Sequence, residues 1–466
     1  METLSQCLYA WMEEEDLTVA QLTERLGFKS KTSVFRLLHG QSNYHSCEQA
    51  CGLLTPCLDQ PWQERFRQAL RVEKVGLRRY AMFQALNRCF FPEKKGKSFS
   101  QSLETGATFP AEGGTVLLLG NPGEAASRLI DDLLTGSEGT RIEHWITLPM
   151  LLDRPELLET MIAHMTDLRY CAFLLPEGCV SALPWNVALW TSSAQTYVVL
   201  TGSGGITWHP VDSEAAQEVQ EALSQLEQIP LYRYDTLETG SDYISFTEAA
   251  YQMEYNRRAV ILRPTPGIQM MPADVVEKTF RDFLSENFET VVTSRETLIY
   301  TFEKRVKNFY ERKQTTVLLL SLKALTRFAR TGVIPDQFYA FRPYTRDERI
   351  RILSALYALA EKKSVKLRFF PSEGSPFSFE AYGDRGGVLI YPSDTNYNTR
   401  MAQYRELYLP GQDAFMLFDE YAAELCEQDS QQDIEKIFDA LIRETEKSKH
   451  RRTNQVSNYT GMDCSF

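Results

Sequence analysis

Residues 17–40 place the tightest constraint on how this chain can fold. Their sequence is LTVAQLTERLGFKSKTSVFRLLHG. Thr18 and Ser30 are residue types that favour the N-cap of a helix, and Gly27 and Gly40 are typical of the position that follows one. Apolar residues recur at helical spacing between each cap and the next glycine. The stretch therefore predicts two short helices joined by a tight turn.

Apolar residues extend this pattern into a small helical core. An amphipathic helix is predicted over residues 4–15, ahead of the helix pair, and the last helix of the pair is expected over 31–38. Phe28 would fill the core from the turn. The expected core positions are Leu4, Leu8, Trp11, Met12, Leu22, Leu26, Phe28, Val34, Leu37 and Leu38.

The segment TERLGFKSKTSVFRLLHG resembles the helix-turn-helix of the lambda repressor/Cro type, the xenobiotic-response-element (XRE) family of regulators. The resemblance runs from Leu22 to Gly40. The turn carries one extra residue around Lys29, and Val19 stands where the family often has glutamine. The resemblance implies an all-α helix-turn-helix domain whose third helix lies in the major groove of DNA.

The same resemblance implies which residues contact DNA. Lys31 and Arg36 can donate to guanine acceptors or to phosphates, and Thr32 or Phe35 can meet a thymine methyl group. The predicted DNA-binding set is Lys29, Ser30, Lys31, Thr32, Ser33, Phe35, Arg36, Gln41 and Ser42. A helical bundle with a solvated basic face, or a helix pair that contacts protein, would fit the same residues. Since single modules of this kind bind weakly, a homodimer reading two half-sites is expected.

Charge is distributed unevenly along the 466 residues, whose formal net charge is −12. Residues 17–97 carry fourteen Lys or Arg and six Asp or Glu, a local balance of +8, so the remaining residues sum to −20. An acidic chain with one basic segment favours an anionic partner at that end only.

Residues 62–97 alternate apolar and basic side chains and predict a long basic helix or a helix pair. Such helices could contact phosphates or hold a dimer, although a solvated surface would carry the same pattern. Three cysteines precede them, Cys47, Cys51 and Cys57. Their spacing matches no common structural zinc pattern, which favours buried free thiols over a metal or redox role.

From residue 115 the pattern changes to buried-type strands alternating with helices, which predicts an α/β body of one or two units. The expected domains are 1–90, 115–230 and 231–446, with a linker over 91–114 and a disordered tail over 447–466. Strands are expected at 115–120, 141–148, 170–176, 196–202, 206–211, 259–264, 316–322, 365–370 and 387–391. Helices are expected at 122–134, 154–168, 212–228, 272–286, 294–312, 345–362 and 413–443.

The body offers few chemical motifs. The turn GNPGEAAS at 120–127 lacks the GK[ST] of a phosphate-binding loop and is interpreted as an ordinary β–α turn. Four arginines lie among Tyr and Phe residues and could form a pocket for an acidic or phosphorylated ligand, or simply a surface rim. They are Arg327, Arg330, Arg342 and Arg346. No catalytic residue, metal site or cofactor is expected.

The sequence therefore predicts a multidomain, bacterial-type transcriptional regulator that binds double-stranded DNA through residues 1–90. Its α/β body would sense a small-molecule or protein effector, or set the oligomeric state. Two alternatives remain: the body is an enzyme of unknown reaction tethered to nucleic acid, or the chain is a protein-interaction scaffold. The sequence has no long apolar run and does not begin with a signal-peptide pattern, so a cytoplasmic protein without a membrane span is expected.

Overall fold

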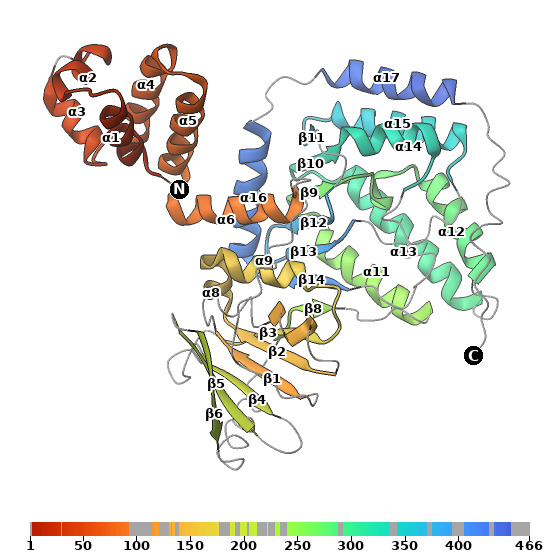
Figure 1. Cartoon of the computed structure of the whole chain (residues 1–466). Helices are drawn as coiled ribbons and strands as arrows, with labels where there is room; N and C mark the ends of the chain where they lie inside the picture. The colour runs from red at the N-terminus through yellow and green to blue at the C-terminus, as the bar shows by residue number, and fades with distance from the viewer. Residues whose placement is uncertain are drawn as a thin grey trace. The chain divides into compact units, whose positions relative to one another are not determined.

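A computed structural model shows the chain as two compact units (Figure 1). The helical unit comprises residues 1–88 and 149–159, and the α/β unit comprises residues 89–148 and 160–466. The structure describes residues 2–28, 30–92, 114–120, 130–131, 133–135, 139–176, 187–191, 196–202, 205–211, 221, 229–233, 240–287, 292–334, 343–370, 375–393, 405–427 and 433–448. Within these ranges, no helix has both the length and the apolar character that a membrane crossing needs.

The N-terminal part of the chain is entirely helical. Residues 149–159 join it from two helices farther along, α8 (Leu148–Asp153) and α9 (Pro155–Ala163). The N-terminal helices are α1 (Leu4–Glu14), α2 (Val19–Arg25), α3 (Lys31–Leu38), α4 (Tyr44–Leu54), the short 3-10 helix η1 (Thr55–Cys57), α5 (Gln60–Val75) and α6 (Leu77–Phe90).

Local signals set the ends of α2 and α3. The Thr18 side chain accepts a hydrogen bond from the backbone N–H of Gln21, and the Gln21 side chain accepts one in return from the Thr18 backbone. Ser30 caps α3 by accepting from the Thr32 backbone N–H at 3.0 Å. Gly27 and Gly40 follow the two helices with φ of +61° and +63°. The predicted caps and stops are thus confirmed.

The predicted helical core is also confirmed. Nine of the ten expected positions are buried, and Phe28 is partly buried against them. Helices α4 and α5 complete this core with Cys47, Ala50, Cys51, Leu54, Trp62, Phe66 and Ala69. Five helices therefore share one apolar interior, which is what fixes the outward face of α3.

The first sheet of the α/β unit has seven strands in the order β6-β5-β4-β1-β2-β3-β7. Strands β1, β2 and β3 are parallel, and the other pairs are antiparallel. The strands are β1 (Thr115–Leu119), β2 (Arg141–Ile146), β3 (Tyr170–Leu174), β4 (Val187–Thr191), β5 (Thr196–Gly202), β6 (Gly205–Val211) and β7 (Ile229–Pro230).

The second sheet also has seven strands, in the order β11-β10-β9-β12-β13-β14-β8, with β9, β10 and β11 parallel. They are β8 (Tyr232–Arg233), β9 (Ala259–Arg263), β10 (Thr316–Ser321), β11 (Val365–Phe370), β12 (Phe377–Tyr382), β13 (Gly387–Pro392) and β14 (Glu406–Leu409). Its helices are α11 (Gly240–Glu254), η3 (Ile268–Met270), α12 (Ala273–Asn287), α13 (Val292–Glu311), α14 (Leu322–Thr331), α15 (Arg346–Ala360), α16 (Gln412–Glu427) and α17 (Ile434–Lys447).

The expected order, helices first and mixed α/β structure afterwards, is confirmed, but several elements differ. The helix predicted over 413–443 is two helices, and Asp433 caps the second by accepting from the Lys436 backbone N–H at 3.1 Å. The strand predicted over 316–322 ends at Ser321, whose side chain caps α14. Strands β4, β12 and β14 and helices α8, α11 and α14 are among the elements that were not predicted. The turn at 120–127, the helices expected at 122–134 and 212–228, the linker and the tail lie largely or wholly outside the described residues.

Candidate nucleic-acid interface

Helix α3 has one buried face and one exposed face. Val34, Leu37 and Leu38 are buried in the core of the helical unit. The opposite face of the same two turns consists of exposed side chains. These are Lys31, Thr32, Ser33, Phe35 and Arg36. Because the buried residues lock the rotation of the helix, the exposed set is presented as a fixed surface.

The end of α3 is anchored to α1. The Ser5 hydroxyl donates a hydrogen bond to the main-chain carbonyl of Leu38, the last residue of α3. The last carbonyls of a helix have no partner within the helix, so this bond satisfies a group that would otherwise depend on water. Helix α1 is itself tied to α5, where Glu73 accepts from the Leu4 backbone N–H at 3.0 Å. Hydrogen bonds therefore link the end of α3 to α1, and α1 to α5.

The cations of α3 are uncommitted. Among the described residues, neither the Lys31 ammonium nor the Arg36 guanidinium has a hydrogen-bond or ion-pair partner. Four arginines of α5 and α6 do have carboxylate partners. The pairs are Arg65–Glu2 at 2.9 Å, Arg67–Glu64, Arg78–Asp153 at 3.8 Å and Arg88–Glu159, with the Arg88 Nε atom 2.7 Å from the carboxylate. Arg25 lies over the Trp11 ring, 5.4 Å from its centroid.

These ion pairs reduce the positive charge that residues 17–97 can offer to an anionic partner. Residues 1–92 contain eleven Lys or Arg and ten Asp or Glu, so the helical part is nearly neutral. The surplus counted over residues 17–97 leaves out the acidic run at 13–16 and includes lysines that lie outside the described residues. Among the described residues of the helical unit, Lys31 and Arg36 of α3 are therefore exposed cations without a partner, as is Arg154 between α8 and α9, whereas several arginines of α5 and α6 are engaged within the unit.

One aromatic side chain stands on the same face. Phe35 is 46% exposed. Its ring lies parallel to the imidazole of His39, with an interplanar angle of 11° and ring centroids 6.3 Å apart. The two residues are one helical turn apart. The exposed face of α3 thus combines two free cations, hydroxyl groups and an apolar ring.

The remaining predicted contact residues lie around α3. Ser30 is exposed at the start of the helix, Gln41 is exposed after its end, and Ser42 is half-buried. Lys29 lies outside the described residues. The structure therefore brings eight of the nine predicted residues onto α3 or its two flanking turns.

The cysteines following α3 divide into two kinds. Cys47 and Cys51 are buried in the helical core, as predicted, whereas Cys57 is exposed, which corrects the expectation for that residue. Burial raises the pKa of Cys51 to about 12 and that of Cys47 to about 11, which suppresses the reactive thiolate. Nowhere in the described part of the chain do three or more His, Cys, Asp or Glu side chains gather in a way that could hold a metal ion.

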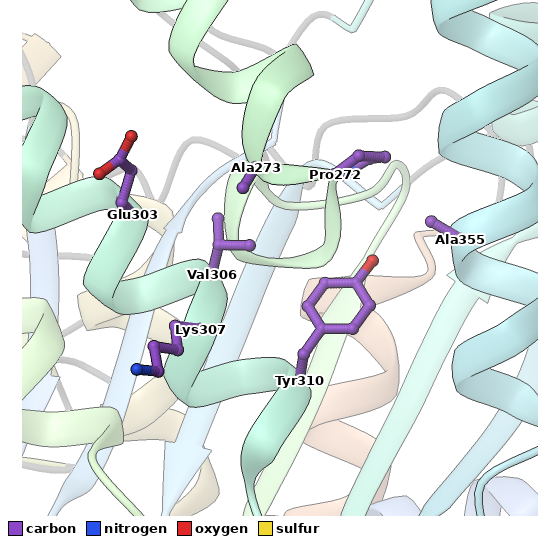
Figure 2. A pocket seen from close by; sticks show the side chains of 7 residues that line it. All are labelled: Pro272, Ala273, Glu303, Val306, Lys307, Tyr310 and Ala355. Carbon is purple, nitrogen blue, oxygen red and sulfur yellow. The ribbon is translucent and has the colours of Figure 1, made fainter.

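Three of the four arginines proposed for a ligand pocket are surface residues. Arg327, Arg330 and Arg346 are exposed, and the Arg330 Nε atom lies 2.7 Å from Glu444. Arg342 lies outside the described residues. A pocket of about 300 Å³ does occur in the α/β unit (Figure 2), but Arg327, Arg330 and Arg346 do not line it. Its lining is mostly apolar and comes from Pro272, Ala273, Glu303, Val306, Lys307, Tyr310 and Ala355.

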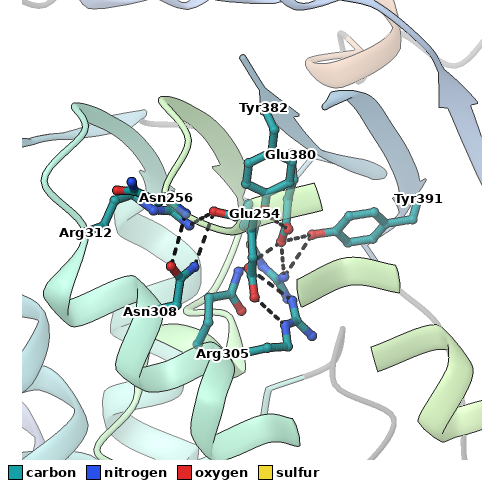
Figure 3. A network of polar contacts seen from close by, with 10 residues as sticks. Glu254, Asn256, Arg305, Asn308, Arg312, Glu380, Tyr382 and Tyr391 are labelled. Atoms are coloured by element: carbon teal, nitrogen blue, oxygen red, sulfur yellow. Dashed lines mark hydrogen bonds and ion pairs between the residues drawn. The ribbon is translucent and has the colours of Figure 1, made fainter. Parts of the chain in front are cut away.

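A buried ionic network in the α/β unit was missed by sequence reasoning (Figure 3). Arg305 donates from Nε to Glu254 at 2.7 Å, and Arg263 donates from Nη1 to Glu380 at 2.9 Å. All four side chains are buried. Burial alone would raise the pKa of Glu380, but the charges of Arg263 and Arg305 and the nearby tyrosine hydroxyls lower it to about 2.

A third arginine completes the network. Arg312 donates from Nη2 to the main-chain carbonyl of Glu254 at 2.9 Å, at the negative C-terminal end of α11. Its guanidinium also lies over the Phe309 ring at 5.3 Å and the Tyr382 ring at 6.0 Å. The network has members on α11, α13, β9 and β12. Its ion pairs and hydrogen bonds therefore hold two helices and two strands of the α/β unit together.

Neither a protein-family model nor a curated protein nor a solved structure matches the chain.

Proposed function

We propose that the chain is a sequence-specific, DNA-binding transcriptional regulator whose helical unit docks α3 in the major groove. Its likeness to the XRE-type helix-turn-helix supplies the docking mode. The observation that carries the proposal is the contrast in ion pairing. Lys31 and Arg36 are exposed without partners among the described residues, while Arg65, Arg67 and Arg88 pair with carboxylates within the unit.

Unpaired cations are the ones best suited to meet DNA. A cation already paired with a carboxylate must break that pair to meet a phosphate or a base edge, whereas an unpaired, exposed cation loses only its water. Counterion release from the duplex then favours the contact. Ser30 and Ser33, with Gln41 after the helix, supply further donors for phosphates at the ends of α3. The α/β unit would serve for effector sensing or for forming a homodimer.

The direct test is replacement of both cations. A duplex pool is first enriched from a randomised library with the full chain, and affinity for the enriched duplex is then measured by fluorescence anisotropy. The K31A/R36A variant should bind at least about tenfold more weakly, because each charged hydrogen bond that is removed is worth on the order of 1 kcal/mol or more. Unchanged affinity would overturn the assignment of α3.

A matched control removes the same charge elsewhere. Lys436 and Arg443 are exposed on α17 and pair with Asp433 and Asp439. The K436A/R443A variant changes net charge by the same amount as K31A/R36A and should leave DNA affinity within about twofold, a bound that corresponds to roughly 0.4 kcal/mol. If both double variants weaken binding equally, the effect is one of net charge and not of α3.

A further inference from the structure

We infer that Phe35 is the residue by which α3 selects thymine, and that His39 positions its ring; this inference rests on the proposed DNA-binding function. Phe35 lies on the outward face of α3, four residues after Lys31 and directly before Arg36. Nearly half of the surface of this residue is accessible, at 46%. The ring is therefore presented on the same surface as the two free cations.

The chemistry of the major groove determines what such a ring can read. Thymine presents a methyl group there beside its O4 acceptor, and no other base of DNA carries such a methyl group. A phenyl ring offers neither a donor nor an acceptor, so it desolvates a polar base edge without compensation. Against a thymine methyl group it removes apolar surface from water instead. Phe35 thus favours thymine and disfavours bases with polar edges at its contact position.

The stack on His39 gives the ring a defined place. The two rings are nearly parallel, at 11°, with their centroids 6.3 Å apart. His39 is also the C-cap of α3, and its backbone N–H donates to the Phe35 carbonyl at 2.9 Å. A ring held on one side by a neighbour loses less rotamer freedom on binding than a free one. His39 is accordingly a positioning residue.

The test removes the methyl group from DNA and the ring from the protein. Duplexes enriched by the full chain are resynthesised with uracil in place of thymine, one position at a time, and affinity is measured with wild-type protein and with F35A. At the contacted position, wild-type protein should bind the uracil duplex about fourfold more weakly, the effect of one buried methyl-sized group. F35A should bind thymine and uracil duplexes equally, with an unchanged dependence on salt.

Two further variants test the role of His39. H39A should reduce the thymine preference, while H39Y, which retains a ring in that place, should restore it. Circular dichroism and the thermal midpoint check that every variant is folded. Because Phe35 and His39 are exposed, these substitutions leave the helical core intact.

Each outcome bears on a different claim. If binding depends on Lys31 and Arg36 but no thymine-to-uracil change separates wild-type protein from F35A, thymine selection by Phe35 is wrong while DNA binding stands. If H39A keeps the full preference, the positioning role is wrong. Equal binding of the isolated single strand, with loss in F35A, would mean base stacking and contradict groove readout. Failure to enrich any duplex would overturn the proposed function itself.

Discussion

The Ser5 hydroxyl of α1 donates to the Leu38 carbonyl at the end of α3, which joins two helices that are separated by α2 in the chain. This bond braces the last turn of the helix that presents Lys31, Phe35 and Arg36. It is also a bond that a single substitution removes without disturbing the apolar core.

Ser5→Ala should therefore lower the free energy of unfolding of the helical unit by about 1 kcal/mol, the net value of a typical intramolecular hydrogen bond. Denaturant unfolding followed by circular dichroism measures it. Ser46→Ala is the matched control, since Ser46 lies on α4 and its hydroxyl makes no hydrogen bond among the described residues. Equal effects of the two variants would show that the Ser5 bond contributes nothing.

The Glu254–Arg305 pair should be costly to break. Arg305→Leu leaves a buried carboxylate without its partner and should destabilise the α/β unit by about 3–5 kcal/mol. The double variant E254L/R305L should recover part of that loss, because neither charge is then buried alone. Arg281→Leu is the control: Arg281 pairs with Glu277 at the surface, 3.0 Å away, and should cost less than about 1 kcal/mol. A small effect of Arg305→Leu would mean that water reaches Glu254.

His144 should make the stability of the α/β unit depend on pH. Its Nε2 atom lies 2.8 Å from the Gly120 carbonyl, which can only accept, so Nε2 carries a proton; in the neutral imidazole Nδ1 then accepts from the Tyr170 hydroxyl at 2.7 Å. Burial favours the neutral imidazole and lowers the pKa of His144 from 6.5 to about 4. As the pH falls below 6.5, His144 becomes protonated in the unfolded chain but stays neutral in the folded chain. The folded state therefore loses stability down to about pH 4.

The expected loss from this histidine is about 2 kcal/mol between about pH 7.5 and about pH 5. Denaturant unfolding of wild-type protein and His144→Gln at the two pH values isolates it, because all other groups titrate in both proteins. Glutamine keeps a donor for Gly120 and cannot titrate. Parallel pH dependence of the two proteins would contradict a buried neutral His144.

Gly332 should be far less tolerant of substitution than Gly40. Both adopt positive φ after a helix, at +75° and +63°. A Cβ atom at Gly332 would lie 2.3 Å from the Tyr344 carbonyl oxygen, whereas at Gly40 it would meet nothing within 4 Å. Gly40→Ala should cost about 1 kcal/mol for the left-handed backbone alone. Gly332→Ala should cost clearly more, and similar midpoint shifts in thermal unfolding would argue against the close approach.

The helical unit could be predicted because its signals are local. Thr18, Ser30, Gly27 and Gly40 each act within a few residues, and the apolar spacing of α3 determines which side chains face outward. The sequence could not predict which lysines and arginines form ion pairs. The partners of Arg78 and Arg88 are Asp153 and Glu159, whose place in the helical unit follows from the fold and not from sequence spacing.

Sequence patterns also failed to predict a strand of the second sheet. Strand β12 has the sequence FSFEAY, in which Ser378 and Glu380 interrupt an apolar pattern although both are buried. They are tolerated because Ser378 hydrogen-bonds Ser393 at 2.7 Å and Glu380 pairs with Arg263, 117 positions away. A pattern of hydrophobicity cannot reveal a strand whose polar residues are satisfied at that distance.

The most direct test of the central claim is the salt dependence of duplex binding by the full chain. If Lys31 and Arg36 meet phosphates or base edges, log K should fall steeply and linearly with log salt concentration. The slope should become shallower in K31A/R36A, by roughly 0.9 for each phosphate that the variant no longer neutralises, and stay unchanged in K436A/R443A. Binding that is insensitive to salt, or a slope that K31A/R36A does not alter, would contradict the docking of α3 on DNA.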